Sequence, residues 1–552
     1  MAGPAAFAPY RLPAGALPEE GVRAALEAGA EPLLASLDDP LPAPLLAQAF
    51  ASIPAGHAAA PDEACRGADG SPAGVPGAPR ACYHSERHRA RLEAAIRRAY
   101  EAGYAGVCLE LPDAPLALGI LGAGFCADCQ RAFARELARE YGDHFQPLDF
   151  LALAREALAS SSGALGHQQL PFGREFWRVR SAWLDRAMVA WVRAARDAAR
   201  AGPRPFQVAA RFEAVGPAQL RAARLLDAAV FPVTAGVQAT GAGLFRLLRA
   251  VMGRRPCAAE LRGEGPLARL AGVAASSGVE VALAEPSASL PALRRFARAA
   301  AARDRGPALA EPLAEVAVLY SPESDLWTGG EHRAQVERAG DALAGLQVQA
   351  PVVLRVAEAR PGVALVLAGA SALSPLEVQE VRRRLDAGGG VLCLGEPGAV
   401  DEAGRPAPLP FPAGKPAGVK ATGGGLVVRL PPLPAPRPGA LPDPHGLEEL
   451  ARTLQALLGR GRRAASSAGR SPLHVALYRQ KDRLDAHVVS LADGPVLGAT
   501  LFVGLQVAGD FRRGRFKSSS GADERIPMNP SGYAISTVLP TFEGYGILSL
   551  PG

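Results

Sequence analysis

A chain of 552 residues is too long for one hydrophobic core, so its length predicts about three domains. Its hydrophobic content of 49%, charged content of 21% and net charge of +6 are typical of a soluble globular protein. The basic residues are interspersed with acidic ones rather than gathered on one face, which argues against a nucleic-acid-binding protein.

Hydropathy and the amino-terminal residues indicate in which compartment of the cell the protein is expected. No apolar run approaches the ~18 residues that a membrane helix needs, so no membrane contact is expected. Residues 1–10 have neither a basic region nor a long apolar stretch, so they do not resemble a signal peptide. We therefore expect a cytoplasmic protein.

From Glu19 to about Arg305 short apolar runs alternate with amphipathic segments, a pattern typical of repeated βα units, and the domain is expected over residues 1–312. The pattern predicts a (β/α)8 TIM barrel, counted back from a last strand at residues 279–284. The first strand is poorly defined, with residues 7–12 as its only candidate, so the barrel is expected to be short at its start. The clearest strands are expected at residues 31–36, 105–111, 206–212, 228–233, 257–261 and 279–284.

A smaller α/β domain is expected over residues 313–408. Apolar runs at residues 316–320, 363–367 and 391–394 indicate buried strands. Ser374 is a helix cap, Pro375 takes the first helical position, and Glu377 can reach back to the cap amide. These elements predict a small doubly wound domain.

The last part of the chain changes character. Residues 409–444 are rich in Pro and Gly, which predicts a linker. Over residues 445–552 a helix precedes short strands, and two of these strands flank a polar turn after Arg479, which indicates a hairpin. A small β-sandwich is the expected fold of this segment.

Acidic residues follow several expected barrel strands, where barrel enzymes carry their working side chains. Strands four and seven lie across the mouth from each other, so Glu110 and Glu260 could face one another over a sugar. A retaining glycosidase needs two carboxyls about 5–5.5 Å apart, one as acid/base and one as nucleophile. Each residue could equally be an ordinary polar residue at a strand end. Further candidates, which could bind substrate, are Asp113, Glu213 and Glu285.

Seven cysteines occur, and five of them fall between Cys65 and Cys129. In a cytosolic protein such a cluster indicates metal ligands or buried thiols before disulfides. Cys126 and Cys129 form a Cys-x-x-Cys pair beyond the fourth strand, and Cys82 precedes the helix that leads into that strand. Structural zinc prefers four ligands, so either Cys65 completes the set or the site is incomplete. Within expected strands, Cys108, Cys257 and Cys393 are predicted to be packed thiols.

Several of these segments resemble the family-42 β-galactosidases. The similarity covers about three quarters of the chain, including a middle domain like the family's trimerisation domain, which also resembles the glutamine-amidotransferase fold. Cys393 lies within an expected strand, so a structural or oligomerising role is favoured for that domain over a catalytic one. The segments that carry the resemblance are residues 54–82, 106–110, 125–129, 133–142, 176–177, 256–260 and 314–406.

The resemblance implies roles for individual residues. Glu110 takes the acid/base position and Glu260 the nucleophile position, with no cofactor needed for catalysis. Cys82, Cys126 and Cys129 take the positions of zinc ligands, and a homotrimer is implied by the middle domain.

Three departures from the family pattern stand beside these matches. Leu109 replaces an Asn that contacts the sugar 2-hydroxyl, and Gly124 replaces a further cysteine of the zinc loop. The segment after strand eight, residues 286–290, is shorter than the family's substrate-binding loop.

Three functions therefore stay open. The first is a retaining glycoside hydrolase that cleaves a β-glycosidic bond, β-galactosidic if the resemblance extends to the sugar. The second is an eroded, non-catalytic relative that binds glycan or serves as an assembly subunit. The third is a barrel enzyme of unrelated chemistry that uses Asp113, Glu213 or Glu285.

Overall fold

Two compact units make up the computed structural model, Phe7–Pro232 and Val233–Gly552 together with Met1–Ala6. We call them the amino-terminal and the carboxyl-terminal unit. The structure describes residues 10–11, 33–37, 41, 43–75, 77–111, 121–142, 149–160, 170–234, 240–263, 267–283, 296, 310–401, 404–407, 419–420, 424–435, 444–458, 463–480, 483–492, 494–509 and 511–551.

Parallel strands form the centre of the amino-terminal unit. Each strand pairs with the next in the sequence, as Val107 does with Val208. Residues 106–109 are all buried, as expected for a strand covered on both faces. The strands are β1 (Tyr10–Arg11), β2 (Leu33–Ser36), β3 (Ala49–Ile53), β6 (Gly106–Leu111), β7 (Gln207–Phe212) and β8 (Ala228–Thr234), with β4 (Gly74–Val75) and β5 (Ala78–Pro79) in a separate pair.

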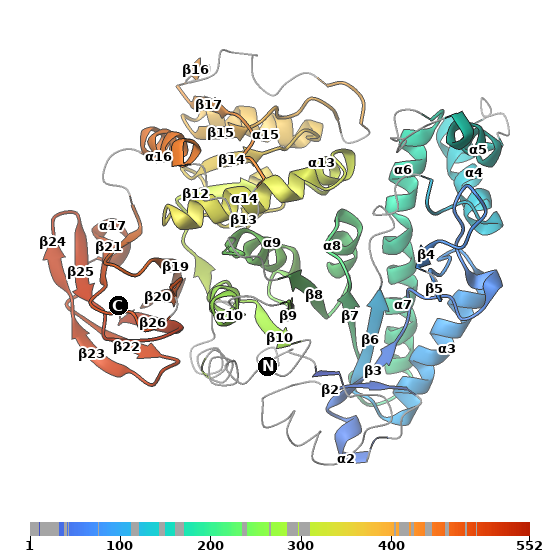
Figure 1. Ribbon diagram of the computed structural model, residues 1–552, viewed down its shortest axis with the longest axis horizontal. Coiled ribbons are helices and arrows are strands. Elements are labelled where there is room, and N and C mark those ends of the chain that lie inside the picture. Colours follow the sequence, from blue (N-terminus) through green and yellow to red (C-terminus); the bar gives the residue numbers. More distant parts are fainter. Residues whose placement is uncertain are drawn as a thin grey trace. The chain divides into compact units, whose positions relative to one another are not determined.

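Helices cover these strands, and α3 packs against α7 along much of its length (Figure 1). Ser85 caps α3 by accepting a hydrogen bond from the amide of His88, and Gly103 ends it with a φ of 103°. The helices are α2 (Ala43–Leu46), η1 (Pro61–Glu63), α3 (Glu86–Ala102), α4 (Ala127–Tyr141), α5 (Phe150–Ser160), α6 (Gly173–Ser181), α7 (Trp183–Arg200) and α8 (Pro217–Ala223).

The carboxyl-terminal unit begins with the last two βα units of the barrel. They comprise α9 (Ala242–Met252), β9 (Cys257–Arg262), α10 (Leu267–Ser276) and β10 (Glu280–Leu283). The eight strands follow the order β1-β2-β3-β6-β7-β8-β9-β10, which is the strand order of a (β/α)8 barrel. The predicted TIM-barrel fold is confirmed, with β6 as strand four and β9 as strand seven.

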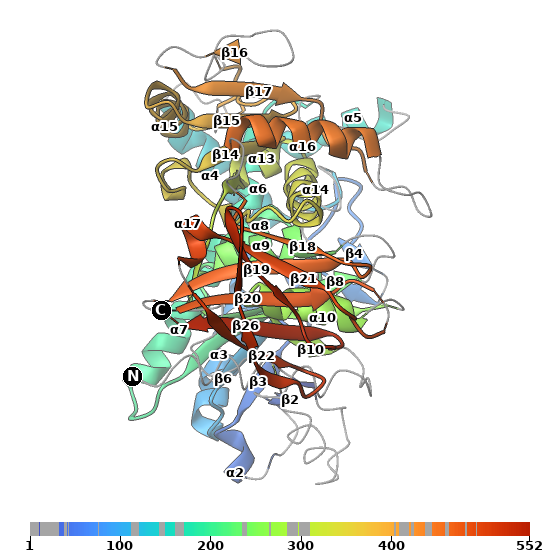
Figure 2. The same cartoon turned by 90° about the vertical axis from the view of Figure 1, so that its left-hand side faces the viewer.

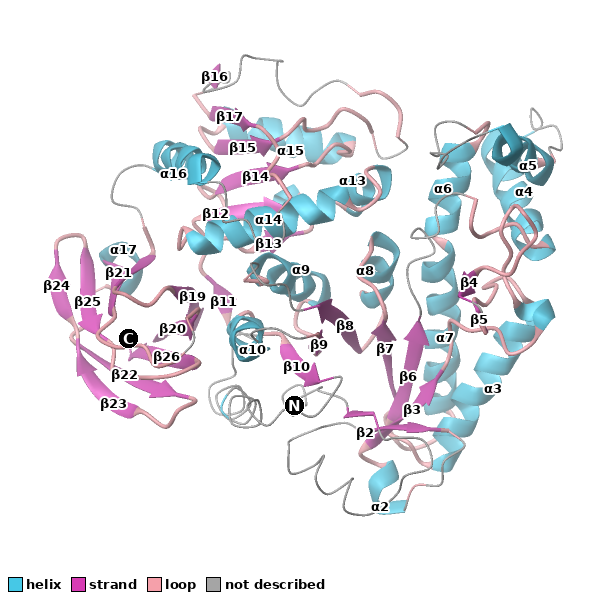
Figure 3. Ribbon diagram, viewed as in Figure 1, coloured by secondary structure: helices cyan, strands magenta, loops and turns pink. Residues whose placement is uncertain are grey.

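A doubly wound α/β domain follows, with helices on its mostly parallel sheet (Figure 3). Ser374 forms the predicted capping box with Glu377. Strand β17 lies inside residues 409–444, the segment predicted as a linker; the domain boundaries themselves stay predictions. In sheet order the strands are β13 (Val352–Val353), β12 (Val316–Leu319), β14 (Ala364–Ala368), β15 (Gly390–Leu394), β17 (Leu426–Leu430) and β16 (Val419–Lys420), and the helices are α13 (Pro322–Trp327), α14 (Glu331–Gly345), η5 (Val356–Glu358), α15 (Pro375–Asp386) and α16 (Pro444–Leu458).

Two antiparallel sheets form the predicted β-sandwich (Figure 2). Buried side chains such as Leu477, Leu501 and Phe516 form its hydrophobic core. One sheet consists of β11 (Glu311–Pro312), β19 (Leu473–Gln480), β20 (Arg483–Ser490), β26 (Tyr545–Pro551), β22 (Arg513–Ser518) and β23 (Asp523–Pro527). The other consists of β18 (Ala465–Ala468), β21 (Thr500–Gly504), β25 (Ala534–Val538) and β24 (Asn529–Ser531), with α17 (Leu505–Ala508) after β21. Among all described helices of the chain, none is long and apolar enough to cross a membrane.

A contact between glycines joins the barrel helix α9 to helix α14 of the α/β domain. A β-carbon on Gly243 would lie 2.2 Å from the carbonyl oxygen of Glu337, and one on Gly340 would lie 2.4 Å from the α-carbon of Gly243. Asp341 accepts hydrogen bonds from the amide of Gly243, at 3.0 Å, and from the hydroxyl of Thr240, at 2.9 Å. The two helices therefore touch backbone to backbone, and Asp341 caps the amino terminus of α9.

Replacing Gly340 by Ala should lower the melting temperature of the protein. The added methyl group has only backbone to displace, and overpacking of this kind typically costs about 1–3 kcal/mol. Gly345→Ala on the same helix is the matched control, because a β-carbon added there would meet no atom within 4 Å and Ala favours a helix. Equal melting temperatures for Gly340→Ala and Gly345→Ala would contradict the close contact.

Buried His332 links three elements of the α/β domain. Its Nε2 accepts a hydrogen bond from the amide of Ser321, at 2.8 Å, so its Nδ1 carries the proton and donates to the carbonyl of Ala368, at 2.7 Å. Burial lowers the pKa of His332 to about 4, below the ordinary 6.5. The ring is therefore neutral in the folded protein at pH 7.

The pKa shift of His332 makes stability depend on pH. Between pH 6.5 and 4 the unfolded chain binds a proton that the folded chain does not, so the contribution is present above pH 6.5 and is lost as the pH falls. The full loss is on the order of 3 kcal/mol. His332→Gln keeps an acceptor for Ser321 but cannot titrate, so its melting temperature should fall less steeply over this range than that of the wild type. Parallel curves for the two proteins would refute the assignment.

Candidate functional site

Glu110 is the fifth residue of β6, near the carboxyl end of the strand, and is half-buried. The hydroxyl of Ser52, at the end of β3, donates a hydrogen bond of 2.6 Å to its Oε1. The amide of Gly56 donates to its backbone carbonyl at 2.9 Å. The neighbouring strand and the loop after it therefore hold both the side chain and the backbone of Glu110 in place.

Leu109, which precedes Glu110, is fully buried. Successive side chains of a strand point to opposite faces, so Leu109 faces away from the side on which Glu110 lies. An apolar residue here fits the packing of the barrel. It cannot supply the amide contact to a sugar hydroxyl that the family resemblance attaches to this position.

Glu260 lies in β9, and the residue is only 7% exposed. The Nε and Nη2 atoms of Arg262 both donate to its Oε2, the former at 2.9 Å. Arg262 is two residues further along the strand, so both side chains leave the same face. A buried carboxylate thus has a cationic partner from its own strand.

Neither Ser52 nor Arg262 was expected from the sequence. Arg262 could have been found, because a spacing of two in a strand places it beside Glu260. Ser52 could not, because the expected strands did not include β3. Both polar contacts depend on strand position rather than on any motif.

The other predicted acidic residues contribute less. Glu213 follows β7 directly, is exposed, and uses its amide to bond the carbonyl of Leu111 at 3.0 Å. Asp113 and Glu285 lie outside the described residues. Glu110 and Glu213 belong to the amino-terminal unit and Glu260 to the carboxyl-terminal unit, so their roles stay predictions.

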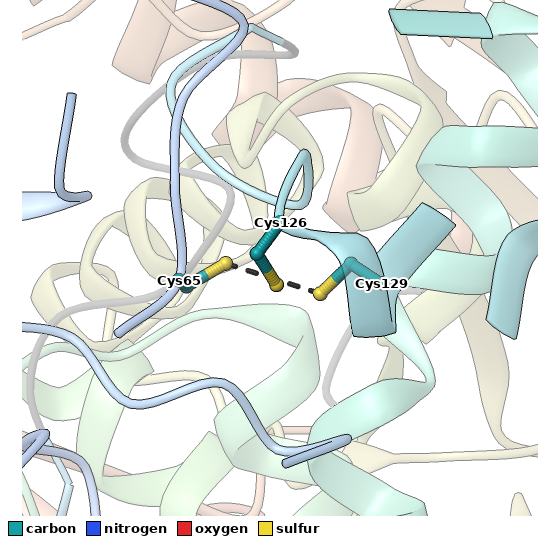
Figure 4. A group of neighbouring side chains, drawn as sticks. All are labelled: Cys65, Cys126 and Cys129. Carbon is teal, nitrogen blue, oxygen red and sulfur yellow. Dashed lines mark hydrogen bonds between the residues drawn. The ribbon is translucent and has the colours of Figure 1, made fainter. Parts of the chain in front are cut away.

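Four cysteines converge beside the amino terminus of α4. The Sγ atom of Cys129 lies 3.5 Å from that of Cys82 and 3.9 Å from that of Cys65, and the Sγ of Cys126 lies 3.3 Å from that of Cys82. The sulfur atoms of Cys65, Cys126 and Cys129 all lie within 4.8 Å of one another and point toward a common centre (Figure 4). Cys65 therefore joins the three cysteines that the resemblance implicates.

The spacing of these thiols fits a metal ion. Tetrahedral zinc with Zn–S bonds of about 2.3 Å requires sulfur atoms about 3.8 Å apart, close to the 3.3–3.9 Å observed. The donor set is also chemically suitable, since four thiolates are a common ligand set of structural zinc. The cluster could hold a metal ion, with Cys65, Cys82, Cys126 and Cys129 as its ligands.

Gly124 occupies the position where the family resemblance led us to expect a further ligand. Its φ is +98°, and a β-carbon there would lie 2.7 Å from the Cζ atom of Phe176. Its amide instead donates to the Sγ of Cys65 at 3.1 Å. Gly124 thus helps to orient Cys65, whose thiol takes the fourth place in the cluster.

Protonation of the cluster also suits a bound cation. Hydrogen bonds from Cys129, Cys65 and Cys82 hold the pKa of Cys126 well below its usual value. The hydrogen bond to Cys126 and burial together raise the pKa of Cys65 to about 12. A bound zinc ion would release the protons that the thiols with raised pKa values hold. The buried guanidinium of Arg180, which donates to the carbonyl of Ala123 at 3.0 Å, would offset the negative charge that four thiolates leave around one zinc ion.

The zinc content of the wild type and of a ligand variant provides a direct test. The purified protein should contain one zinc ion per chain by native mass spectrometry, and Cys65→Ala should lose the metal and melt at a lower temperature. Cys257→Ala is the matched control, because Cys257 is also a buried cysteine but lies in β9 and is not one of the four clustered thiols. Full zinc content in Cys65→Ala would show that Cys65 is not a ligand.

The whole chain was compared with protein-family models, with curated protein sequences and with solved structures. No protein-family model and no curated protein sequence matches it. Solved structures do match. A β-galactosidase from Rahnella sp. R3 is 12% identical, with 100% of this chain and 99% of that chain covered at a TM-score of 0.65. One from Bacillus circulans sp. alkalophilus is 12% identical, with 99% of each chain covered at a TM-score of 0.67. A GH42 β-galactosidase from G. stearothermophilus is 10% identical, with 99% of this chain and 98% of that chain covered at a TM-score of 0.65. The chain therefore has the fold of GH42 β-galactosidases over its whole length, at low sequence identity.

Proposed function

We propose that this protein is a retaining glycoside hydrolase that cleaves a β-glycosidic bond, with Glu260 as nucleophile and Glu110 as acid/base. The observation that carries the proposal is the likeness in fold to β-galactosidases over the entire chain. In that fold Glu110 and Glu260 lie in strands four and seven, toward the ends where barrel enzymes place their catalytic groups. A β-galactoside is the proposed substrate.

The contacts of the two carboxyl groups suit these roles. Ser52 donates to Oε1 of Glu110 and so helps to orient the carboxyl group that, in this proposal, protonates the leaving oxygen. Arg262 binds Oε2 of Glu260 and so helps to orient the carboxylate that attacks the anomeric carbon and forms the glycosyl ester. When water later cleaves that ester, Arg262 stabilises the carboxylate that leaves.

Other parts of the proposal follow from the same likeness and from the cysteine cluster. The bound metal is proposed to be zinc, with a structural role that keeps the loop between β3 and α3 against α4. From the family resemblance we propose that the protein forms a homotrimer through its α/β domain. From the sequence we propose a cytoplasmic location. Catalysis in this scheme needs no cofactor.

Glycosyl azide products distinguish the two carboxyl groups. Glu110→Ala should slow hydrolysis of poorly activated substrates by about 10²- to 10⁴-fold. It should still form the glycosyl ester from a dinitrophenyl β-galactoside, whose leaving group needs no acid. Added azide should then yield the β-glycosyl azide. Glu260→Ala should form no ester, and azide should yield the α-glycosyl azide. Products would be assigned by NMR. Glu101→Gln, an exposed carboxylate on α3, is the control and should keep full activity. An α-azide from Glu110→Ala would reverse the roles.

A non-catalytic glycan-binding or assembly subunit is the second candidate. Buried Leu109 favours it, because a side chain without polar atoms replaces one that would bind the sugar 2-hydroxyl in the transition state. Absence of turnover on a full panel of aryl glycosides, together with saturable binding of a galactose-terminated oligosaccharide, would establish this alternative and refute the hydrolase.

A further inference from the structure

A cavity of about 560 Å³ lies in the carboxyl-terminal unit, at the end of the barrel where β9 begins. Gly253 and Arg254, in the turn between α9 and β9, form part of its wall. The cavity is thus at the opposite end of β9 from Arg262. Its volume lies within the range of about 300–1,000 Å³ that small-molecule sites occupy.

Arginines dominate one wall of this cavity. Arg246 and Arg249 lie three residues apart on α9, hence on the same side of the helix, and Arg254 follows from the turn. Arg246 donates to the carbonyl of Ala350 at 3.2 Å, a contact that orients its guanidinium but does not neutralise it. Neither Arg246 nor Arg254 forms an ion pair within the described part of the chain.

Nearby carboxylates offset the burial of these arginines only in part: burial lowers the pKa of Arg246 and Arg249, although Asp341 acts on the first and Glu280 on the second. Glu311 is the one carboxylate among the described lining residues, and it forms an ion pair with Arg360. Placing cations of like sign together in a half-buried cavity is unfavourable unless an anion joins them. The cavity therefore has the electrostatics of an anion site.

His474 supplies a second, independent sign of a missing partner. It lies on the same face of β19 as Ala476 and Tyr478, which line the cavity, because side chains alternate along a strand. The residue is only 1% exposed, and neither ring nitrogen has a hydrogen-bond partner among the described residues. Burial is the larger cause that lowers the pKa of His474 to about 3, and the charge of Arg246 is a smaller one. The neutral ring therefore has an N–H to donate. Buried polar groups are rarely left without partners.

We propose that this cavity binds a phosphoryl group, as inorganic phosphate or as the phosphate of a small sugar phosphate. A phosphate carries a charge of about −1.5 to −2 at pH 7 and three or more acceptor oxygens, which matches several guanidinium groups better than a carboxylate does. Pro312, Pro351 and Val352 provide an apolar side for an organic body. This proposal is independent of the proposed hydrolase activity.

The position of the cavity indicates what the ligand does. The working groups of barrel enzymes lie at the carboxyl ends of the strands, so a ligand at the start of β9 is an effector or stabiliser and not the substrate. It would contact α9, the segment before β13, and β19 at once. Binding would therefore tie the barrel helix to the α/β domain and to the sandwich.

Isothermal titration of the full chain at constant ionic strength tests the proposal with inorganic phosphate, a hexose 6-phosphate and the unphosphorylated hexose. Phosphate or hexose phosphate should bind saturably and the plain hexose should not. Arg246→Gln and Arg254→Gln should each weaken binding by roughly 10- to 100-fold, the loss expected for a charge-assisted hydrogen bond. Arg452→Gln, an exposed arginine of α16 that does not line the cavity, is the control.

Each outcome decides between the sources or against the site. Equal affinity for phosphate and hexose phosphate identifies inorganic phosphate, and tighter binding of the hexose phosphate identifies a sugar phosphate. Absence of saturable binding by both anions overturns the proposal, as does an equal effect of Arg452→Gln and Arg254→Gln. Arg254 is exposed, so its replacement leaves the fold intact and keeps the test valid if Arg246→Gln fails to fold.

Discussion

Backbone contact between helices α9 and α14 is the constraint on which much of the carboxyl-terminal unit depends. Neither Gly243 nor Gly340 can bear a side chain, so the helices approach more closely than ordinary packing allows. Asp341 adds a cap that fixes the start of α9. From that start the helix runs past Arg246 into the turn before β9, the strand that carries Glu260. This contact thus fixes the position of the helix that lines the cavity and leads into β9, the strand of the proposed nucleophile.

The amino-terminal unit has a different organising feature, the four-thiol cluster. Cys65 and Cys82 lie in the long segment between β3 and α3, and the cluster fastens this segment to α4. The same segment supplies the amide of Gly56 to the carbonyl of Glu110. A metal ion bound here would stiffen the surroundings of the proposed acid/base without touching a substrate.

The fold was largely predictable from the sequence. Strands such as β6 and β9 are buried on both faces, and this leaves a continuous apolar run in the sequence. The capping box at Ser374 was predictable because it is a local interaction between residues three apart. Contacts between segments far apart in the sequence were not predictable. The arginine-lined cavity joins α9, β11 and β19, which no local pattern connects. Cys65 could be placed only as an optional ligand, because no sequence pattern brings it to the Cys-x-x-Cys pair.

Gly124 has a consequence for how such a cluster can change during evolution. A cysteine at this position would need a backbone conformation that side chains rarely adopt, and it would have to displace Phe176. Cys65 already brings a fourth thiol to the cluster. Within this backbone Cys65 therefore completes the four-thiol set without the strain and the displaced aromatic ring that a cysteine at residue 124 would require. A lineage could pass from Cys65 to a cysteine at residue 124 only through an intermediate with three thiols or a remodelled aromatic neighbourhood, so the choice of fourth ligand, once made, is entrenched by its surroundings.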